Sequence, residues 1–365
     1  MLPSEKIANR YAEIFVSAFE RITDGGQRSL VVSNSFPQQY ANGKPCQGGN
    51  LMLTSLVSAM YGYRVPVWLT ANKLNEIGCL IRKGEHGVPI VNYTVAFRRK
   101  GEKTPDWKMT DELNDALSPD EKKEWVRNVF MKSYSEFNIE QTNFPEVYPD
   151  QWAALQEHFQ VEERLAGPCE VLDRMVSEDT WLCPIIQDAE AVDCRYMINR
   201  DEIVVPERSR VAALSAYYNR LVHEMAHSTG SELRMDRVLD TTDLKEHAKE
   251  ELIAELSSAI VGTVLGIETT IQDHNLSFLK SWCGVISEDP NIIYTAVYQA
   301  SGVADTITKY LGVTLSNGYD LDKLMVGVEA AQKAKEEYEK RREQRSVRYG
   351  DDGPVNVTGK MKRRR

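Results

Sequence analysis

Two histidines four residues apart, with a glutamate between them, form the clearest chemical pattern in this sequence. The segment His223-Glu224-Met225-Ala226-His227 has the H-E-x-x-H spacing. Residues i and i+4 share one face of a helix, so both imidazoles can reach a single metal ion. Glu224 then points toward a water on that ion and can act as its general base. The spacing predicts a hydrolytic zinc-type site with His223 and His227 as ligands and Glu224 as the catalytic base.

A third protein ligand is needed, because catalytic zinc sites combine three protein ligands with one open position. The acidic segment Lys249 to Glu255 lies downstream, and its residues Glu251 and Glu255 are four apart on one helix face. This arrangement resembles the gluzincin pattern, in which a ligand glutamate is followed four residues later by another acid. The resemblance implies that Glu251 binds the metal and that Glu255 orients a ligand histidine. Three alternatives stay open for the third ligand: Glu250, Glu255 with Glu251 in the outer position, and His247.

The histidine motif must lie on a helix for this chemistry to work. Apolar residues recur at helical spacing from Val211 to Met225, and Ser228-Thr229-Gly230 supplies a stop. The motif is therefore expected on a buried amphipathic helix. Two plainer interpretations are a pair of core histidines and a metal site without catalysis, although a purely structural site has no need of Glu224.

The charge of the chain is distributed unevenly. The whole chain has a formal net charge of −10, with +2 in residues 1–142 and −12 in residues 143–365. Residues 25–105 alone have a net charge of +7. Such asymmetry indicates a polyanionic partner for the N-terminal part. The acidic surroundings of the histidine motif would repel phosphate, which argues against a nuclease.

Three N-terminal segments combine glycine, aromatic and basic residues. Basic side chains and the N–H groups of glycine turns can contact phosphates, and exposed aromatic rings can stack on unpaired bases, as in single-stranded nucleic acid binding. The plainer interpretation places the aromatic residues in the core and the lysines on a solvated face. The predicted DNA-binding residues are Lys44, Asn50, Trp68, Arg82, Lys83 and Tyr93.

Taken together and in order, these motifs resemble the antirestriction protein ArdC family. The resemblance rests on Gly43-Lys44, Gly48-Gly49-Asn50, Trp68-Leu69-Thr70, Arg82 to Gly87, Phe137 to Gln141, His223 to His227 and Glu250 to Glu255. It implies a single-stranded-DNA-binding domain followed by a zincin-like metallopeptidase domain with Zn²⁺, and protection of the DNA of a mobile element. Its implied partners are single-stranded DNA and an unidentified protein substrate or host defence protein. Cys46-Gln47 departs from the family pattern, which tends to have an aromatic and a basic residue there.

The periodicity predicts an α+β fold, with a small α+β domain followed by a mainly helical one. The expected domains are residues 1–143, 150–315 and 316–365, with a linker at Phe144 to Asp150 and a mobile insertion at Lys100 to Asp120. The last part is expected to be a charged helix, Leu321 to about Arg345, and a disordered basic tail. Helices are expected at residues 5–22, 51–61 and 69–77, strands at 88–97 and 131–137, and mostly helix from 152 to about 315.

Several function classes are excluded by composition. No apolar run approaches the roughly 18 residues of a membrane span, and we expect a cytoplasmic protein without membrane contact. The six cysteines contain no C-x-x-C pair, so reduced core thiols are expected rather than a disulfide framework. One alternative function stays open: a non-catalytic protein that covers single-stranded DNA and uses zinc only to stabilise its fold.

Overall fold

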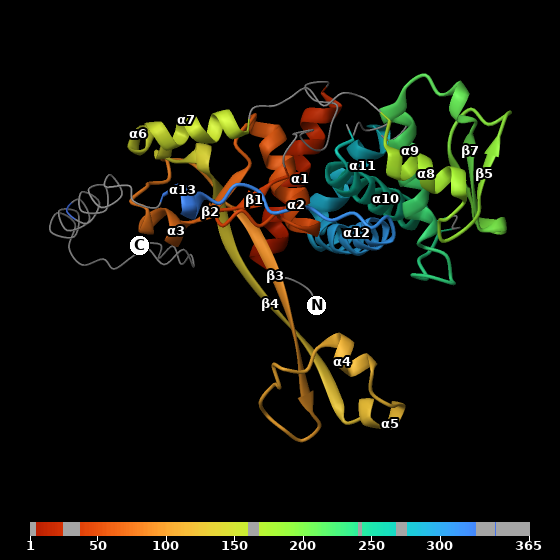
Figure 1. Ribbon diagram of the computed structural model, residues 1–365, viewed down its shortest axis with the longest axis horizontal. Coiled ribbons are helices and arrows are strands. Elements are labelled where there is room, and N and C mark those ends of the chain that lie inside the picture. Colours follow the sequence, from red (N-terminus) through yellow and green to blue (C-terminus); the bar gives the residue numbers. More distant parts are fainter. Residues whose placement is uncertain are drawn as a thin grey trace.

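The computed structural model describes residues 5–24, 37–159, 168–239, 243–267, 276–325 and residue 340. These residues form an α+β fold, as predicted, with two separate sheets and a group of packed helices between them (Figure 1). All six cysteines are free, and four of them are buried. In the described part of the chain, no helix is both long and apolar enough to cross a membrane.

The N-terminal sheet has four strands in the order β1-β2-β4-β3. Strand β1 pairs in parallel with β2, and the other neighbours are antiparallel. Its strands are β1 (Gln39–Tyr40), β2 (Val67–Thr70), β3 (Val88–Arg99) and β4 (Trp125–Asn138). The long β3–β4 hairpin extends away from the body of the molecule (Figure 1), and we call its projecting part, residues 92–132, the arm.

The helices predicted for the N-terminal part form, with shifted boundaries. The predicted helix at residues 69–77 begins as strand β2, and helix starts only where the Thr70 side chain accepts a hydrogen bond from the Lys73 N–H. The helices are α1 (Glu5–Thr23), α2 (Gly48–Tyr61) and α3 (Ala71–Glu76).

The predicted insertion forms the end of the arm and contains local structure. Helices α4 (Asp111–Asp115) and α5 (Pro119–Lys122) lie between the two long strands. Each has its own N-cap, since Thr110 accepts from the Leu113 N–H and Ser118 forms a capping box with Glu121. The turn formers that suggested an irregular segment therefore act as helix caps.

The segment predicted as a linker is helical and partly buried. Phe144 and Tyr148 are fully buried, and helices α6 (Phe144–Val147) and α7 (Pro149–His158) replace the expected break. Both prolines of this segment lie in the first turn of a helix, where their missing N–H costs nothing. The two prolines thus begin helices instead of interrupting them.

The C-terminal part contains a sheet that the sequence interpretation missed. Three short strands lie in the order β5-β7-β6, with β5 and β7 parallel and β6 antiparallel at the edge. The strands are β5 (Ile185–Asp188), β6 (Arg195–Met197) and β7 (Glu202–Pro206). The helices are α8 (Glu170–Glu178), α9 (Leu214–Ser228), α10 (Leu244–Leu265), α11 (Leu276–Glu288), α12 (Asn291–Tyr310) and α13 (Leu321–Leu324). Short 3₁₀ turns occupy Ile139–Gln141, Ile198–Arg200 and Arg208–Arg210.

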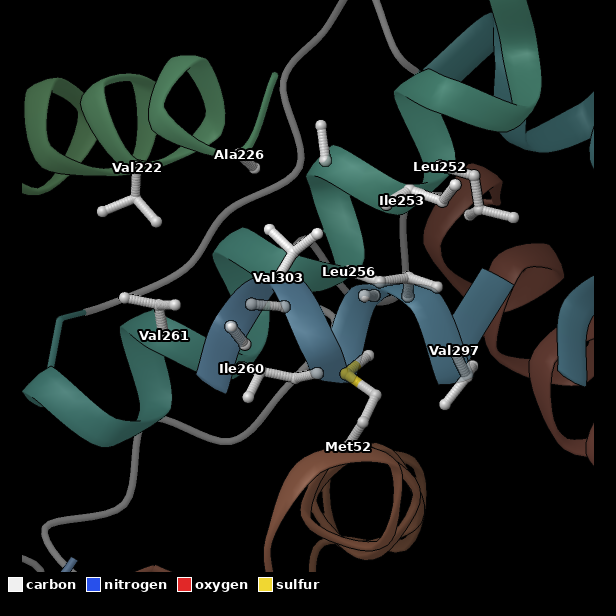
Figure 2. Close-up of a cluster of buried hydrophobic side chains, with 14 of the residues drawn as sticks. Met52, Val222, Ala226, Leu252, Ile253, Leu256, Ile260, Val261, Val297 and Val303 are labelled. Atoms are coloured by element: carbon white, nitrogen blue, oxygen red, sulfur yellow. The ribbon is translucent and has the colours of Figure 1, made fainter. Parts of the chain in front are cut away.

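One hydrophobic core joins the two parts of the chain. Helix α12 lies between α10 and α2, and Figure 2 shows Met52 of α2 close to Ile260 of α10, with Val297 of α12 nearby. The same core includes α1 and the helix of the histidine motif, α9. The core therefore includes residues of both predicted domains.

A segment after α12 returns to the N-terminal sheet. The Gly318 N–H donates to the Gly43 carbonyl at 2.7 Å, and the Leu321 N–H donates to the Ala41 carbonyl at 2.9 Å. The Gln39 amide bonds both backbone polar groups of Tyr319. The predicted helix from Leu321 is described only as α13, and its residues 326–339 and 341–345, like the basic tail, lie outside the described residues.

Gly318 is expected to be intolerant of any side chain. A Cβ there would lie 1.8 Å from Gln39 Oε1, inside the buried amide contact just described. We expect Gly318→Ala to lower the free energy of unfolding by about 1–3 kcal/mol. Gly302→Ala is the matched control, because no atom of the described residues beyond its own helical turn lies within 4 Å of its Cβ position in α12. It should raise stability by about 0.5–1 kcal/mol. Urea unfolding of both variants tests this, and equal effects would contradict it.

Candidate metal centre and nucleic-acid surface

Two packed helices bring the predicted metal ligands together. Helix α9 carries His223 and His227, and α10, which packs against α9, carries Glu251. Donor atoms of these three residues lie within 4.8 Å of one another. His223 is only 3% exposed, and the other two are partly buried. His247 does not belong to this cluster in the described part of the chain.

The donor atoms converge on one point. The two Nε2 atoms of His223 and His227 are 3.0 Å apart. The Glu251 carboxylate places Oε2 3.5 Å from the Nε2 of His223 and Oε1 3.5 Å from the Nε2 of His227. Four ligands at 2.0–2.1 Å around a tetrahedral ion lie about 3.3 Å from each other. Two imidazoles and one carboxylate at these separations therefore fit a divalent ion of the zinc type.

The outer contact to His227 comes from Glu250. His227 Nδ1 lies 3.1 Å from Glu250 Oε1, and Arg237 grips both carboxylate oxygens of Glu250 at 2.8 and 2.9 Å. Arg237 also donates to the Ala226 carbonyl at 2.7 Å, which ties the end of α9 to α10. This chain of contacts fixes the ring of His227, as an outer partner of a metal ligand does.

Glu255 lies on the other side of the cluster. Its Oε1 is 3.7 Å from the Nδ1 of His223, beyond hydrogen-bond distance. Glu255 thus lies beside a histidine, as expected, but the hydrogen-bonded outer carboxylate belongs to Glu250, which the sequence left as an alternative.

The charges of the clustered histidines and glutamates are strongly coupled. Burial alone would raise the pKa of Glu251, but contacts with His223 and His227 outweigh it and lower that pKa. Burial alone would lower the pKa of His227, yet hydrogen bonds to Glu250 and Glu251 raise it to about 10. These hydrogen bonds couple the charge of His227 to the charges of Glu250 and Glu251.

Glu224 is held by the edge strand of the second sheet. Its Oε2 accepts a hydrogen bond from the Tyr196 N–H of β6 at 2.7 Å. Strand β6 and helix α9 pack together, so the backbone of β6 fixes where this carboxylate points. Tyr196 and Arg237 were both missed by the sequence interpretation. Both residues reach the site only because the chain folds back against α9. Their spacing from the histidine motif in the sequence gives no sign of these contacts.

The structure divides the predicted DNA-binding residues into two groups. Lys44, Arg82, Lys83 and Tyr93 are exposed, although Arg82 pairs with Glu146 at 2.8 Å. The other two, Asn50 and Trp68, belong to the interior.

The buried pair corrects the prediction. Trp68 is 0% exposed and its Nε1 donates to Gln38 at 2.7 Å, so it cannot stack on a base. Asn50 uses its side chain to bond both the N–H and the carbonyl of Val91 at 3.0 Å. The glycines before it also have a packing role, since a Cβ on Gly49 would lie 2.9 Å from Val297 of α12. This part of the motif therefore packs α2 against β3 and α12.

A cavity of about 700 Å³ lies where the arm meets α12. It is lined by residues of α2, β3 and α12, and by Arg237 beside the metal cluster. Tyr93 lies at this junction, with its ring 5.6 Å from that of Tyr298 and its hydroxyl against that of Tyr294. Tyr93 thus occupies the contact between the two parts of the chain.

Glu136, at the base of the arm, predicts an unusual pH dependence. It is 4% exposed, its Oε2 has no hydrogen-bond partner among the described residues, and burial raises its pKa from 4.5 to about 8. The stabilisation from its proton is complete below pH 4.5, declines as pH rises, and is gone above pH about 8. Between pH 4.5 and pH 8 the free energy of unfolding therefore falls, and we expect Glu136→Gln to remove up to about 4 kcal/mol of this fall. Thermal unfolding at pH 5 and pH 8 measures it, with the exposed Glu157→Gln as charge control; an unchanged pH dependence in Glu136→Gln would contradict it.

Comparison with known proteins identifies the class of domain that contains the metal cluster. Residues 185–299 match the family model of a zincin-like metallopeptidase, a range that includes the second sheet, α9 and α10. Residues 6–137 match the model for the N-terminal domain of the anti-restriction factor ArdC. The chain therefore combines a match to the ArdC N-terminal domain with a match to a zincin-like metallopeptidase domain, and the predicted resemblance to the ArdC family is confirmed.

Similar proteins support the same assignment. Protein y4eC of Sinorhizobium fredii is 26% identical over 274 residues, which span 74% of this chain and 80% of that protein. A DNA primase TraC of Escherichia coli is 27% identical over 251 residues, 68% of this chain but only 22% of TraC. The metal-free crystal structure of antirestriction protein ArdC from plasmid R388 has a TM-score of 0.57 at 23% identity, covering 83% of this chain and 97% of that one. A Mn(II)-bound structure of the same protein has a TM-score of 0.54 at 23% identity and covers 82% and 97%. These structures establish a shared fold.

Proposed function

We propose that this chain is a single-stranded-DNA-binding protein with an attached metal-dependent peptidase, and that it protects the DNA of a mobile element. The observation that carries the enzymatic half is the convergence of His223, His227 and Glu251 beside Glu224. The names of its relatives, a DNA primase and an antirestriction protein of a plasmid, support a partner that is DNA.

The three converging residues would hold Zn²⁺. A bound divalent ion supplies Lewis acidity that activates water and polarises a carbonyl. The pair of imidazoles favours zinc over the harder ions Mg²⁺ and Ca²⁺, which prefer all-oxygen sites. Glu250, clamped by Arg237, keeps the His227 ring oriented so that its Nε2 faces Glu251.

Glu224 would move the proton in peptide hydrolysis. Its Oε2 is fixed by the Tyr196 N–H, which leaves Oε1 to accept a proton from the attacking water and pass it to the leaving amine. A carboxylate held by one strong backbone hydrogen bond keeps its position during this transfer. The remaining residues of the site therefore orient ligands, and Glu224 carries the acid–base step.

Three measurements on the purified full-length protein test this proposal. Elemental analysis without added chelator should find about one zinc per chain, and unfolded casein should be cleaved in a reaction that a chelator stops. Fluorescence anisotropy should show binding to labelled oligothymidine that weakens as salt rises. Absence of any divalent metal would overturn the enzymatic half, and absence of salt-dependent binding would overturn the DNA half.

A further inference from the structure

Exposed aromatic rings lie along the arm and at its root. Trp107 is 62% exposed, Phe130 42% and Tyr134 39%. Trp107 packs on Phe130 with ring centroids 5.9 Å apart, and this contact leaves most of its surface uncovered. The Tyr134 hydroxyl accepts from the Asn92 amide at 2.8 Å, which fixes the ring at the root of the arm. Large apolar rings are seldom left this exposed in a row without a partner.

Strand alternation places Phe130 and Tyr134 on the face opposite to Met131 and Tyr93. Met131 and Tyr93 are paired across the hairpin, and both contact α12: Tyr294 lies 3.4 Å from the Met131 sulfur, and Tyr298 is in ring contact with Tyr93. Successive side chains of a strand point to opposite faces. Phe130, Lys132 and Tyr134 of β4 therefore share the opposite face, along about 13 Å of strand. We call Trp107, Phe130, Lys132 and Tyr134 the arm stripe.

The charge around the arm stripe complements a polyanion. Residues 98–108 and 125–134 contain seven Lys and Arg against two Asp and Glu, in a chain whose net charge is −10. Lys132 is exposed and lies between the two rings of β4, and Lys108 is exposed beside Trp107. The acidic residues of the arm concentrate in α4 and α5 at its end. Basic side chains alternating with exposed rings are typical of surfaces that bind unpaired nucleic acid.

We propose that the arm stripe is a binding track for single-stranded DNA, with bases stacked on Trp107, Phe130 and Tyr134 and a phosphate at Lys132. This inference rests on the proposed function and deepens it, because it moves the base contacts from the glycine-rich loop and Trp68 to the arm. A duplex offers no free base faces to these rings, because its bases are already stacked on one another.

Substitutions in the full-length protein test the track. Trp107→Ala and Phe130→Ala should each weaken binding to oligothymidine by about 5- to 100-fold, the usual range for loss of one stacked base. Trp107→Phe should retain most of the affinity, because stacking needs only an aromatic face. Lys132→Ala should lower the slope of log Kd against log salt by about 0.7, the effect of one phosphate contact on a single strand. Leu113→Ala, which removes an exposed apolar side chain from the end of the arm, is the control and should bind like wild type.

Photocrosslinking supplies a readout that does not depend on folding of a variant. Bromodeoxyuridine oligonucleotides irradiated with wild-type protein should crosslink to peptides that contain Trp107, Phe130 or Tyr134. The track would be overturned if both alanine variants bound oligothymidine as tightly as the wild type, or if crosslinks were confined to Lys44, Arg82 and Lys83. Either result would leave the proposed DNA function intact. Equal loss of duplex and single-strand binding in Trp107→Ala would also overturn it. Wild-type protein that binds no single strand at all would overturn the proposed function itself.

Discussion

Replacing Glu251 by alanine is expected to remove the divalent metal from the protein almost completely. Glu251 is the one carboxylate within reach of both Nε2 atoms in the described cluster, and its loss leaves two imidazoles that cannot hold the ion alone. Elemental analysis of Glu251→Ala should find well below a tenth of the wild-type metal content, about a tenfold or greater loss. Activity against casein should disappear with the metal.

Two other glutamates of α10 serve as controls for this prediction. Glu250→Ala should weaken metal affinity by about 10- to 100-fold without abolishing binding, because it only orients His227. Glu246→Ala changes the same charge on an exposed part of α10 and should leave metal content unchanged. Full metal content in Glu251→Ala would show that another residue is the third ligand.

Replacing Glu224 by glutamine should separate catalysis from every other property. Glutamine keeps the size of the side chain and can still accept the Tyr196 hydrogen bond, but it cannot take up the proton of the attacking water. We expect hydrolysis of casein to fall by about 10²- to 10⁴-fold. Metal content and thermal stability should stay near the wild-type values.

The same substitution distinguishes a peptidase from a protein that only covers DNA. Salt-dependent binding to oligothymidine should persist in Glu224→Gln, since the arm lies on the other part of the fold. Glu232→Gln, on the exposed loop after α9, controls for the loss of one negative charge. Unchanged casein cleavage in Glu224→Gln would exclude Glu224 as the base and would favour a contaminating protease or a different catalytic group.

Local spacing was enough to predict the ligand helix. His223 and His227 are separated by one helical turn, so their meeting on one face of α9 follows from helix geometry alone. Glu251 was assigned through the resemblance to the gluzincin pattern, and the spacing alone left Glu250, Glu255 and His247 as alternatives. The α+β class and the two-part composition also followed from periodicity and motif order.

Only the tertiary structure decided which residues surround these ligands and which reach solvent. Arg237 and Tyr196 meet the site because α9, α10 and β6 pack together, and no periodicity in the sequence encodes that packing. Trp68 appeared suited to stacking on bases, but burial is set by the layers that cover it. Trp107 is exposed because the β3–β4 hairpin extends beyond the helices that could have covered it. Sequence fixes the chemistry that each side chain can offer, whereas long-range packing fixes which of those groups meet each other and which meet water.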